Sequence, residues 1–356
     1  MTKLKILTLV LALCLVLPLL VACRGNNEAD VHVFYYNYSD TYISSVRTAL
    51  DDELQRAGIS YQDYDGNGSQ TTQTEQIRTA VTKGAKAILV NIVNTGSDDA
   101  AGEITQLARD AGIPVVFFNR EVNDEVVNGY DKCVYVGTRA EEAGILQGEL
   151  IGEYLVKNFA ACDLNNDGEI SYILFKGEEG NNEAIYRTKY SVEEANKALA
   201  EAGKKPLRFY DKSNPNAYLV DKNGLWSATA ANEYMTTALT AYNAAGNNMI
   251  ELVICNMDGM AVGAISALNA AGYNKGGSSP TIPVFGVDAT DAAQNLIKNK
   301  QMSGTIKQDA VGMAKALQHL AQNAVTEGRD LLADTGSFTM DEGTRKMRIH
   351  YEKYVG

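Results

Sequence analysis

Apolar runs and amphipathic stretches alternate along the chain at a regular spacing. Four strand-like runs start near residues 31, 59, 86 and 114, and one helical pattern stands in each interval between them. These helical patterns cover residues 41–57, 71–83 and 97–111. Strands that alternate with helices in this way are typical of βαβ units, in which helices cover both faces of a parallel sheet.

The same alternation continues through the rest of the chain. Further strands are predicted at residues 132–138, 170–177, 206–211, 250–255, 282–288 and 301–307. Helices are predicted at residues 139–158, 183–202, 227–245, 258–271, 289–299 and 309–326, before a strand-rich tail. About ten repeats of one supersecondary unit are more than a single core usually carries. The pattern therefore predicts an α/β fold of two doubly wound parallel-sheet lobes.

One long apolar run near the N-terminus departs from this alternation. Residues 6–22 follow Lys3 and Lys5 and end directly before Cys23. A short basic start, an apolar stretch and small residues before a cleavage point are typical of a signal peptide. A retained transmembrane anchor is the alternative, which Pro18 and the marginal length of the run disfavour.

The last four residues of this segment, Leu-Val-Ala-Cys at 20–23, fit a bacterial lipobox. We therefore expect residues 1–22 to be a lipoprotein signal peptide and Cys23 to carry lipid as the first residue of the mature chain. Residues 23–30 would form a polar tether. The protein would then be exported and anchored by its lipid on the outer face of the cytoplasmic membrane, at the cell surface or in the periplasm.

Charge and cysteine usage narrow the class of protein further. The chain has a net charge of −12, and without residues 1–22 the balance is 30 basic against 44 acidic residues, or −14. Such an acidic chain is not expected to bind nucleic acid. Cys133, Cys162 and Cys255 remain in the mature part, widely spaced and with no CxxC pair, which disfavours a redox motif or a thiolate zinc site. A single disulfide stays open.

Polar and aromatic residues follow several of the predicted strands. Residues 36–42 (YNYSDTY), 119–121 (NRE), Asp288 and Gln308-Asp309 all stand at strand ends. Ligands of open parallel sheets bind beyond the carboxyl ends of the strands. Aromatic rings that stack on a sugar face, together with carboxylates and amides that bind hydroxyl groups, suit a monosaccharide. Each such residue taken alone could equally be the cap of the next helix.

Motifs of enzymes and regulators are missing from the sequence. His32, His319 and His350 lie far apart, and there is no GxSxG, Walker or strand-linked GxGxxG motif. Asp40 and Asp288 could in principle serve a glycosidase, but hydroxyl binding explains them better. A sugar-responsive transcription regulator would need a basic helix-turn-helix before residue 30, where the predicted signal peptide stands. We therefore expect no enzymatic activity.

Several longer strings resemble one family of exported receptors. The strings are residues 35–50 (YYNYSDTYISSVRTAL), 113–121 (IPVVFFNRE), 130–138 (YDKCVYVGT), 144–151 (GILQGELI), 163–170 (DLNNDGEI), 250–264 (IELVICNMDGMAVGA) and 282–289 (IPVFGVDA). In them the chain is similar to the periplasmic galactose/glucose-binding proteins of bacterial ABC importers, which are ribose-binding-like type I receptors. The resemblance implies two lobes that are joined by a three-strand hinge and close over one monosaccharide.

The resemblance also implies which residues bind the sugar. They are Tyr36, Asp40, Tyr42, Asn119, Asn181, Glu183, Arg187, Trp226, Met257, Asp288 and Gln308. Trp226, the only tryptophan, would stack on the sugar opposite Tyr42. Five positions depart from the family pattern: Tyr42 stands for phenylalanine, Asn181 for histidine, Glu183 for aspartate, and Met257 and Gln308 for asparagine. The resemblance implies D-galactose or D-glucose as the sugar. Because the thioether of Met257 cannot donate a hydrogen bond, a relative of these sugars or a slightly shifted position of the sugar in the cleft is the alternative.

A second motif points to calcium. Residues 163–171 (DLNNDGEIS) place oxygens at positions 1, 3, 5, 7 and 9 of an EF-hand-like loop and glycine at position 6, but position 12 is Leu174 rather than glutamate. The resemblance implies that Glu251 supplies the missing carboxylate. The expected ligands of a structural Ca²⁺ are Asp163, Asn165, Asp167, Glu169, Ser171 and Glu251. An Asn/Asp/Gly-rich turn without metal is the alternative.

The resemblance further predicts the partners and the lobe boundaries. The sugar would be delivered to the membrane subunits of an ABC permease by a monomeric receptor, and a chemoreceptor or sensor kinase is the alternative partner. Chain crossings are expected after Asn119, at Gln308 to Asp309, and near residues 340–343. The first lobe would then hold residues 31–119 and 309–340, and the second residues 120–308 and 341–356.

Overall fold

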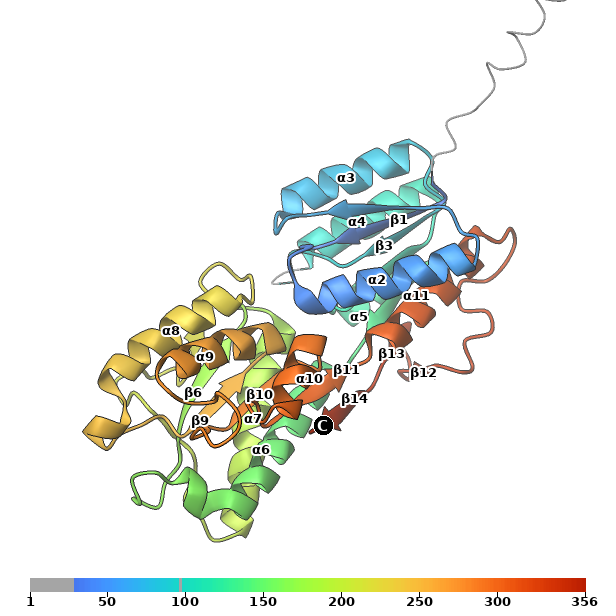
Figure 1. The fold of residues 1–356 in the computed structure, drawn as a ribbon. Coiled ribbons are helices and arrows are strands. Elements are labelled where there is room, and N and C mark those ends of the chain that lie inside the picture. The colour runs from blue at the N-terminus through green and yellow to red at the C-terminus, as the bar shows by residue number, and fades with distance from the viewer. Residues whose placement is uncertain (1–28, 96–97) are drawn as a thin grey trace, which may run out of the picture.

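The computed structural model describes residues 29–95 and 98–356, and these residues form two α/β lobes (Figure 1). Each lobe is built on one seven-stranded, mainly parallel sheet. The predicted α/β fold with two parallel-sheet lobes is confirmed. The predicted signal peptide, Cys23 and most of the tether lie outside the described residues.

The first sheet has the strand order β12-β13-β5-β4-β3-β1-β2. Its strands are β1 (Val31–Tyr35), β2 (Tyr61–Asp65), β3 (Ala87–Val90), β4 (Val115–Phe118), β5 (Cys133–Gly137), β12 (Thr339–Met340) and β13 (Lys346–Arg348). The helices of this lobe are α2 (Thr41–Arg56), α3 (Gln70–Thr82), α4 (Asp99–Ala111), α5 (Asp124–Asn128) and α11 (Ala310–Val325). Only β12 pairs antiparallel, at one edge.

The second sheet has the strand order β14-β11-β10-β9-β6-β7, and β8 also pairs with β6. Its strands are β6 (Ser171–Lys176), β7 (Arg208–Phe209), β8 (Leu219–Val220), β9 (Leu252–Cys255), β10 (Val284–Asp288), β11 (Gly304–Gln308) and β14 (Tyr351–Tyr354). Its helices are α6 (Ala140–Cys162), α7 (Asn182–Glu201), α8 (Ala228–Ala241), α9 (Asp258–Ala270) and α10 (Asp291–Lys298), with a short 3-10 helix η2 (Ala244–Gly246). The sequence predicted neither α5 nor β8.

Both faces of each sheet are buried. In β1, Val33 and Tyr35 belong to one core cluster, whereas Phe34 belongs to the cluster on the other face. In β6, Ile173 and Leu174 divide between two clusters in the same way. Because successive side chains of a strand point to opposite faces, a strand that is covered on both sides must be apolar throughout. This explains the continuous apolar runs of the sequence.

Three segments of the described chain pass from one sheet to the other. They lie between β5 and α6 near Thr138, between β11 and α11 at Gln308 to Asp309, and between β13 and β14 near Ile349. The second crossing was predicted correctly. The predicted crossing after Asn119 is wrong, because β5 still pairs with β4 in the first sheet. The crossing predicted near residues 340–343 is also wrong, because β13 pairs with β5 and extends the first sheet to Arg348.

None of the helices in the described part of the chain is long and apolar enough to cross a membrane. Cys133, Cys162 and Cys255, the three cysteines of the described residues, are buried and form no disulfide. Burial raises the pKa of the Cys133 thiol to about 12 and that of Cys162 to about 11. These thiols are therefore protonated core residues at neutral pH.

Candidate functional site

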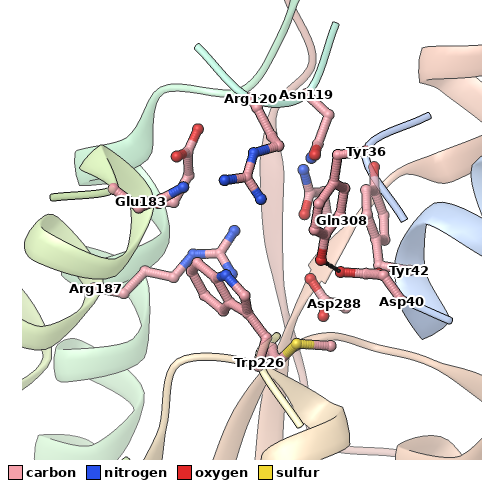
Figure 2. Close-up of a pocket in the computed structure, with 12 residues that line it drawn as sticks. Tyr36, Asp40, Tyr42, Asn119, Arg120, Glu183, Arg187, Trp226, Asp288 and Gln308 are labelled. Carbon is pink, nitrogen blue, oxygen red and sulfur yellow. Dashed lines mark hydrogen bonds between the residues drawn. The ribbon is translucent and has the colours of Figure 1, made fainter. Parts of the chain in front are cut away.

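A cleft between the two lobes gathers the predicted sugar-binding residues (Figure 2). The space between its lining side chains is about 370 Å³, which includes space that is open to solvent. It is lined by Tyr36, Asp40, Tyr42, Asn119, Arg120, Asn181, Glu183, Arg187, Trp226, Met257, Asp288 and Gln308. All eleven residues predicted for the sugar site are in this set, and Arg120 is the one addition.

The first-lobe wall is fixed by the start of α2. Asp40 is the N-cap of this helix, where its Oδ1 accepts a hydrogen bond from the backbone N–H of Ile43 at 2.8 Å. Its Oδ2 accepts another from the Tyr36 hydroxyl at 2.7 Å. Tyr42 follows in the first turn and is almost fully buried. Asp40 therefore caps a helix, which was the alternative role considered for polar residues at strand ends. Its carboxylate also faces the cleft.

The second-lobe wall is formed by the first two turns of α7. Asn181 caps the helix by accepting from the Ala184 N–H at 3.1 Å, and Glu183 and Arg187 lie one turn apart on the buried face. Arg187 donates from Nη1 to the Asn256 carbonyl at 2.8 Å and from Nη2 to the Tyr351 hydroxyl at 2.9 Å. These two bonds hold the guanidinium at the base of the cleft.

Trp226 forms part of the floor in a left-handed backbone conformation, with φ of 55°. It follows residues 212–225, a stretch that includes β8 and leads along the edge of β6. The indole lies against Gly177, where an added Cβ would overlap its ring. Its Nε1 donates to Glu178 Oε2 at 3.4 Å. Gly177 is therefore required for the indole to lie where it does.

Asp288 and Gln308 stand at the carboxyl ends of β10 and β11. Ligands of open parallel sheets usually bind at this edge of the sheet. Burial raises the pKa of the Asp288 carboxyl well above its usual range, while the Arg187 charge works in the opposite direction. Burial likewise raises the pKa of Glu183. A carboxyl group that is shielded from water in this way can act as donor or acceptor toward a hydroxyl group.

Several buried polar atoms around the cleft have no hydrogen-bond partner within the described chain. They are Glu183 Oε2, Arg187 Nε, Arg120 Nε and both polar atoms of the Gln308 amide. Buried polar groups in proteins are almost always paired, so a group of them at one cleft indicates a polar ligand. Donors and acceptors are both present, which matches hydroxyl groups because each hydroxyl can donate and accept.

Met257 also lines the cleft, at the N-cap position of α9, and its side chain makes no capping bond. A thioether offers the ligand an apolar, polarisable surface and only a weak acceptor. The structure thus places a non-donating side chain in the cleft at a position where the resemblance implied asparagine, which can donate a hydrogen bond.

Arg120 was missed by the sequence interpretation, although it directly follows Asn119 at the end of β4. Its guanidinium lies 4.3 Å from the centre of the Tyr36 ring and donates to the Val93 carbonyl at 3.0 Å. It also pairs with Glu178 Oε2 at 2.7 Å, across the cleft. The position at a strand end was a usable signal, but the direction of the side chain was not readable from it.

In the loop that is predicted to bind calcium, Glu251 forms hydrogen bonds with residues at both ends. Glu251 Oε1 accepts from the Leu164 N–H at 2.8 Å, and Oε2 accepts from the N–H and the hydroxyl of Ser171 at 2.8 and 3.0 Å. Within the loop, Asp163 accepts from the N–H groups of Asp167 and Gly168. Glu251, which directly precedes β9 and is 80 residues away from Ser171 in the sequence, therefore joins the two ends of the loop.

The other predicted ligands face different partners. Asn165 Oδ1 accepts from the Asp167 N–H at 3.0 Å, and Glu169 pairs with Arg208 at 2.8 Å. Across residues 29–95 and 98–356, no three His, Cys, Asp or Glu side chains are arranged to hold a metal ion. Glu169 would therefore have to contribute its backbone carbonyl, which is the group that position 7 of an EF-hand loop supplies.

Two α/β lobes that are joined by three chain crossings, with a polar and aromatic cleft between them, are the arrangement of a receptor for a small polar solute. The family model for the periplasmic binding protein domain matches residues 31–330 of the chain. The protein therefore belongs to the periplasmic binding protein family, whose members are solute-binding receptors and not enzymes.

Individual relatives agree with this assignment. The chain is 34% identical over 330 residues to the D-galactose/methyl-galactoside binding periplasmic protein MglB of Haemophilus influenzae, covering 92% of this chain and 88% of the relative. It is 30% identical over 280 residues to a putative rhizopine-binding protein of Rhizobium meliloti, covering 78% of each chain.

Solved structures show the same fold. An ABC transporter solute binding protein of Bacillus halodurans with bound myo-inositol has a TM-score of 0.68 at 23% identity, covering 93% of this chain and 96% of that one. One of Clostridium phytofermentans with bound β-D-glucose has a TM-score of 0.69 at 19% identity, covering 91% and 93%.

Proposed function

We propose that the protein is an extracytoplasmic receptor that binds one monosaccharide in the interlobe cleft and delivers it to an ABC sugar permease. The observation that carries this proposal is the group of unpartnered polar atoms on Glu183, Arg187 and Gln308 beside aromatic side chains. The hydroxyl groups of a sugar would pair with these atoms, while Trp226 and Tyr42 would cover its two C–H faces.

Binding would work without covalent chemistry. Asp40 and Tyr36 line the cleft from the first lobe, and Arg187 and Trp226 line it from the second, so a bound sugar would contact both lobes. A ligand that binds the closed arrangement more tightly than the open one shifts the population toward the closed form. Membrane subunits that recognise the closed form would then receive only loaded receptor.

D-Galactose or D-glucose is the sugar that we propose. The support is the 34% identity to a galactose-binding relative and the chemistry of Asp40, Arg187 and Asp288. Charge-assisted hydrogen bonds to hydroxyl groups are strong in a cleft that excludes water. Met257 and Gln308 are the positions from which a preference for a related sugar, such as an epimer or an inositol, would arise.

The experiment is a calorimetric titration of the mature protein with a panel of neutral monosaccharides and myo-inositol. We expect saturable one-to-one binding of at least one hexose with micromolar or tighter affinity. Arg187→Met should abolish it, because the variant removes the donors at the base of the cleft. Lys189→Met, two residues further along α7 and outside the cleft lining, is the matched control and should bind normally. Absence of binding to the whole panel would reject the proposal.

A structural Ca²⁺ in the loop at residues 163–171 is a second proposal. It is supported by Glu251, whose carboxylate reaches both ends of the loop, and by the oxygens of Asp163, Asn165 and Asp167. Calcium prefers such carboxylate and carbonyl oxygens. The ion would hold the loop to the start of β9, remote from the sugar cleft.

Lipid attachment at Cys23 is a third proposal, which rests on residues 20–23 of the sequence. It predicts that the full-length protein fractionates with membranes, and that Cys23→Ala releases it into the soluble fraction.

A chemoreceptor or sensor kinase remains the alternative partner to the permease. Stimulation of permease ATPase activity by the loaded protein, but not by the unloaded protein, would favour transport.

A further inference from the structure

Glu178 contacts three residues that line the cleft, although it does not itself belong to the lining. It follows β6 in the second lobe, and its Oε2 accepts from Arg120 Nη2 at 2.7 Å, from Asn181 Nδ2 at 3.3 Å and from Trp226 Nε1 at 3.4 Å. Arg120 belongs to the first lobe, so the first of these contacts bridges the cleft. One carboxylate oxygen thus holds three residues of the candidate sugar site.

Arg120 also connects the ion pair to residues of the first lobe that line the cleft. The Arg120 guanidinium lies over the ring of Tyr36 at 4.3 Å, and the Tyr36 hydroxyl donates to Asp40 at 2.7 Å. The Arg120 side chain is only 6% exposed, and that of Glu178 is 26% exposed. A buried guanidinium keeps its positive charge. Arg120 can therefore bind an anionic ligand only if its guanidinium is not already paired with a carboxylate of the protein.

The charges that line the cleft and the Arg120–Glu178 pair both disfavour an anionic ligand. Asp40, Glu183 and Asp288 line the cleft with Arg120 and Arg187, which gives three carboxyl groups and two guanidinium groups. Glu178 adds a fourth carboxylate at 2.7 Å from Arg120. An anionic ligand would have to compete with Glu178 for Arg120 and would face an excess of acidic groups.

We propose that Glu178 is a positioning residue that determines charge selectivity: by pairing with Arg120 across the cleft, it makes the site select neutral sugars over sugar acids. This inference rests on the proposed function, since it concerns the ligand class of the same cleft. In the absence of the Glu178 charge, Arg120 is free to bind a ligand carboxylate in the two-pronged geometry that guanidinium groups favour.

The test compares the affinities of D-glucose and D-galactose with those of D-glucuronate and D-galacturonate for wild type and variants. Glu178→Gln keeps the shape and an acceptor oxygen for Trp226 and Asn181 but removes the charge. It should shift the ratio of uronate to hexose affinity by about tenfold or more toward the uronate. Glu178→Ala should shift the ratio in the same direction. Glu179→Gln, whose wild-type carboxylate pairs with Lys176 instead, is the matched control and should leave the ratio unchanged.

The double variant Arg120→Gln/Glu178→Gln should lose the gain in uronate affinity, because the guanidinium that binds the acid is gone. A purely structural role of Glu178 would weaken both classes of sugar equally and leave the ratio as in wild type, which would overturn the inference. So would a wild-type protein that prefers the uronate. If the wild type binds a neutral hexose but Glu178→Gln leaves the ratio of uronate to hexose affinity unchanged, the inference about Glu178 is wrong and the proposed receptor function stands. If it binds no sugar at all, both proposals fall.

Discussion

Arg187 and Tyr351 join the candidate sugar site to the hinge. Arg187 Nη2 donates to the Tyr351 hydroxyl at 2.9 Å, and the same hydroxyl accepts from Thr138 Oγ1 at 2.8 Å. Thr138 lies at the first crossing between the lobes, and Tyr351 begins β14 directly after the third. The guanidinium that we expect to bind the sugar is therefore held by two of the three crossing segments.

Tyr351→Phe should weaken sugar binding while the protein stays folded. Loss of the hydroxyl leaves one donor of a buried guanidinium unpaired, which costs about 1–3 kcal/mol of folding stability. The guanidinium also loses a bond that fixes its position in the cleft, so we expect sugar affinity to fall by roughly tenfold. Calorimetric titration and thermal unfolding would measure the two effects separately. Tyr354→Phe, in the same strand but outside the cleft lining, is the control. Equal affinities for wild type and Tyr351→Phe would show that the hinge does not position Arg187.

Asp288→Asn should stabilise the unliganded protein at neutral pH and impair sugar binding. Burial raises the pKa of the Asp288 carboxyl, so in the pH range above its unfolded value of about 3.9 the folded state holds a proton that the unfolded state releases. The free energy of unfolding then falls as pH rises through that range. The variant lacks this contribution, so its unfolding midpoint should rise relative to wild type as pH is raised from about 4 to 8.

Thermal unfolding of both proteins across that pH range tests this prediction. Asp258, which lies close by, titrates in the same window, since burial raises its pKa to about 7. The comparison with wild type is therefore made as a difference at each pH. Parallel pH profiles of the two proteins would contradict the prediction.

Gly177→Ala should displace the indole of Trp226 and lower sugar affinity by more than about tenfold, because the added Cβ would overlap the ring. Gly102→Ala in α4 is the control, because its Cβ would meet open space and alanine is the better helix former by about 0.5–1 kcal/mol. The emission maximum of Trp226 and a sugar titration would report the two consequences. An unchanged emission spectrum with unchanged affinity would show that the glycine is dispensable.

Calcium should raise the unfolding temperature, and a chelator should lower it, if the loop at residues 163–171 holds the ion. Binding to the native state alone stabilises it in proportion to the logarithm of ligand concentration over Kd. Glu251→Gln should remove this dependence, because the carboxylate that closes the loop is lost. A wild-type midpoint that is the same in calcium and in chelator would count against the site.

The sequence predicted the alternating strands and helices of the two lobes. The central strands are covered by helices on both faces, so their residues form continuous apolar runs that can be recognised in the sequence. It did not predict which sheet each strand joins. β5 joins the first sheet beside β4, and β13 joins it by pairing with β5 from a distant part of the chain. No local pattern carries the information on this second pairing. The crossing at Gln308 was predictable because a strand end, a polar pair and a helix start coincide there.

The site residues could be predicted because strand ends and family strings coincide at Asp40, Asn119 and Asp288. Arg120 and Glu178 could not, because their roles depend on an ion pair between residues 58 positions apart in different lobes. Such tertiary contacts set the direction of a side chain in a loop. The pattern of apolar and polar residues along the sequence does not reveal them.

The most direct measurement of the central claim is the fluorescence of Trp226 during titration with monosaccharides. It is the only tryptophan, and it lines the cleft, so its emission reports on this site alone. We expect a saturable change in intensity or wavelength with D-galactose or D-glucose at micromolar concentration, and none with Arg187→Met. An emission spectrum that stays constant through a full panel of monosaccharides would contradict the assignment of this cleft as a sugar site.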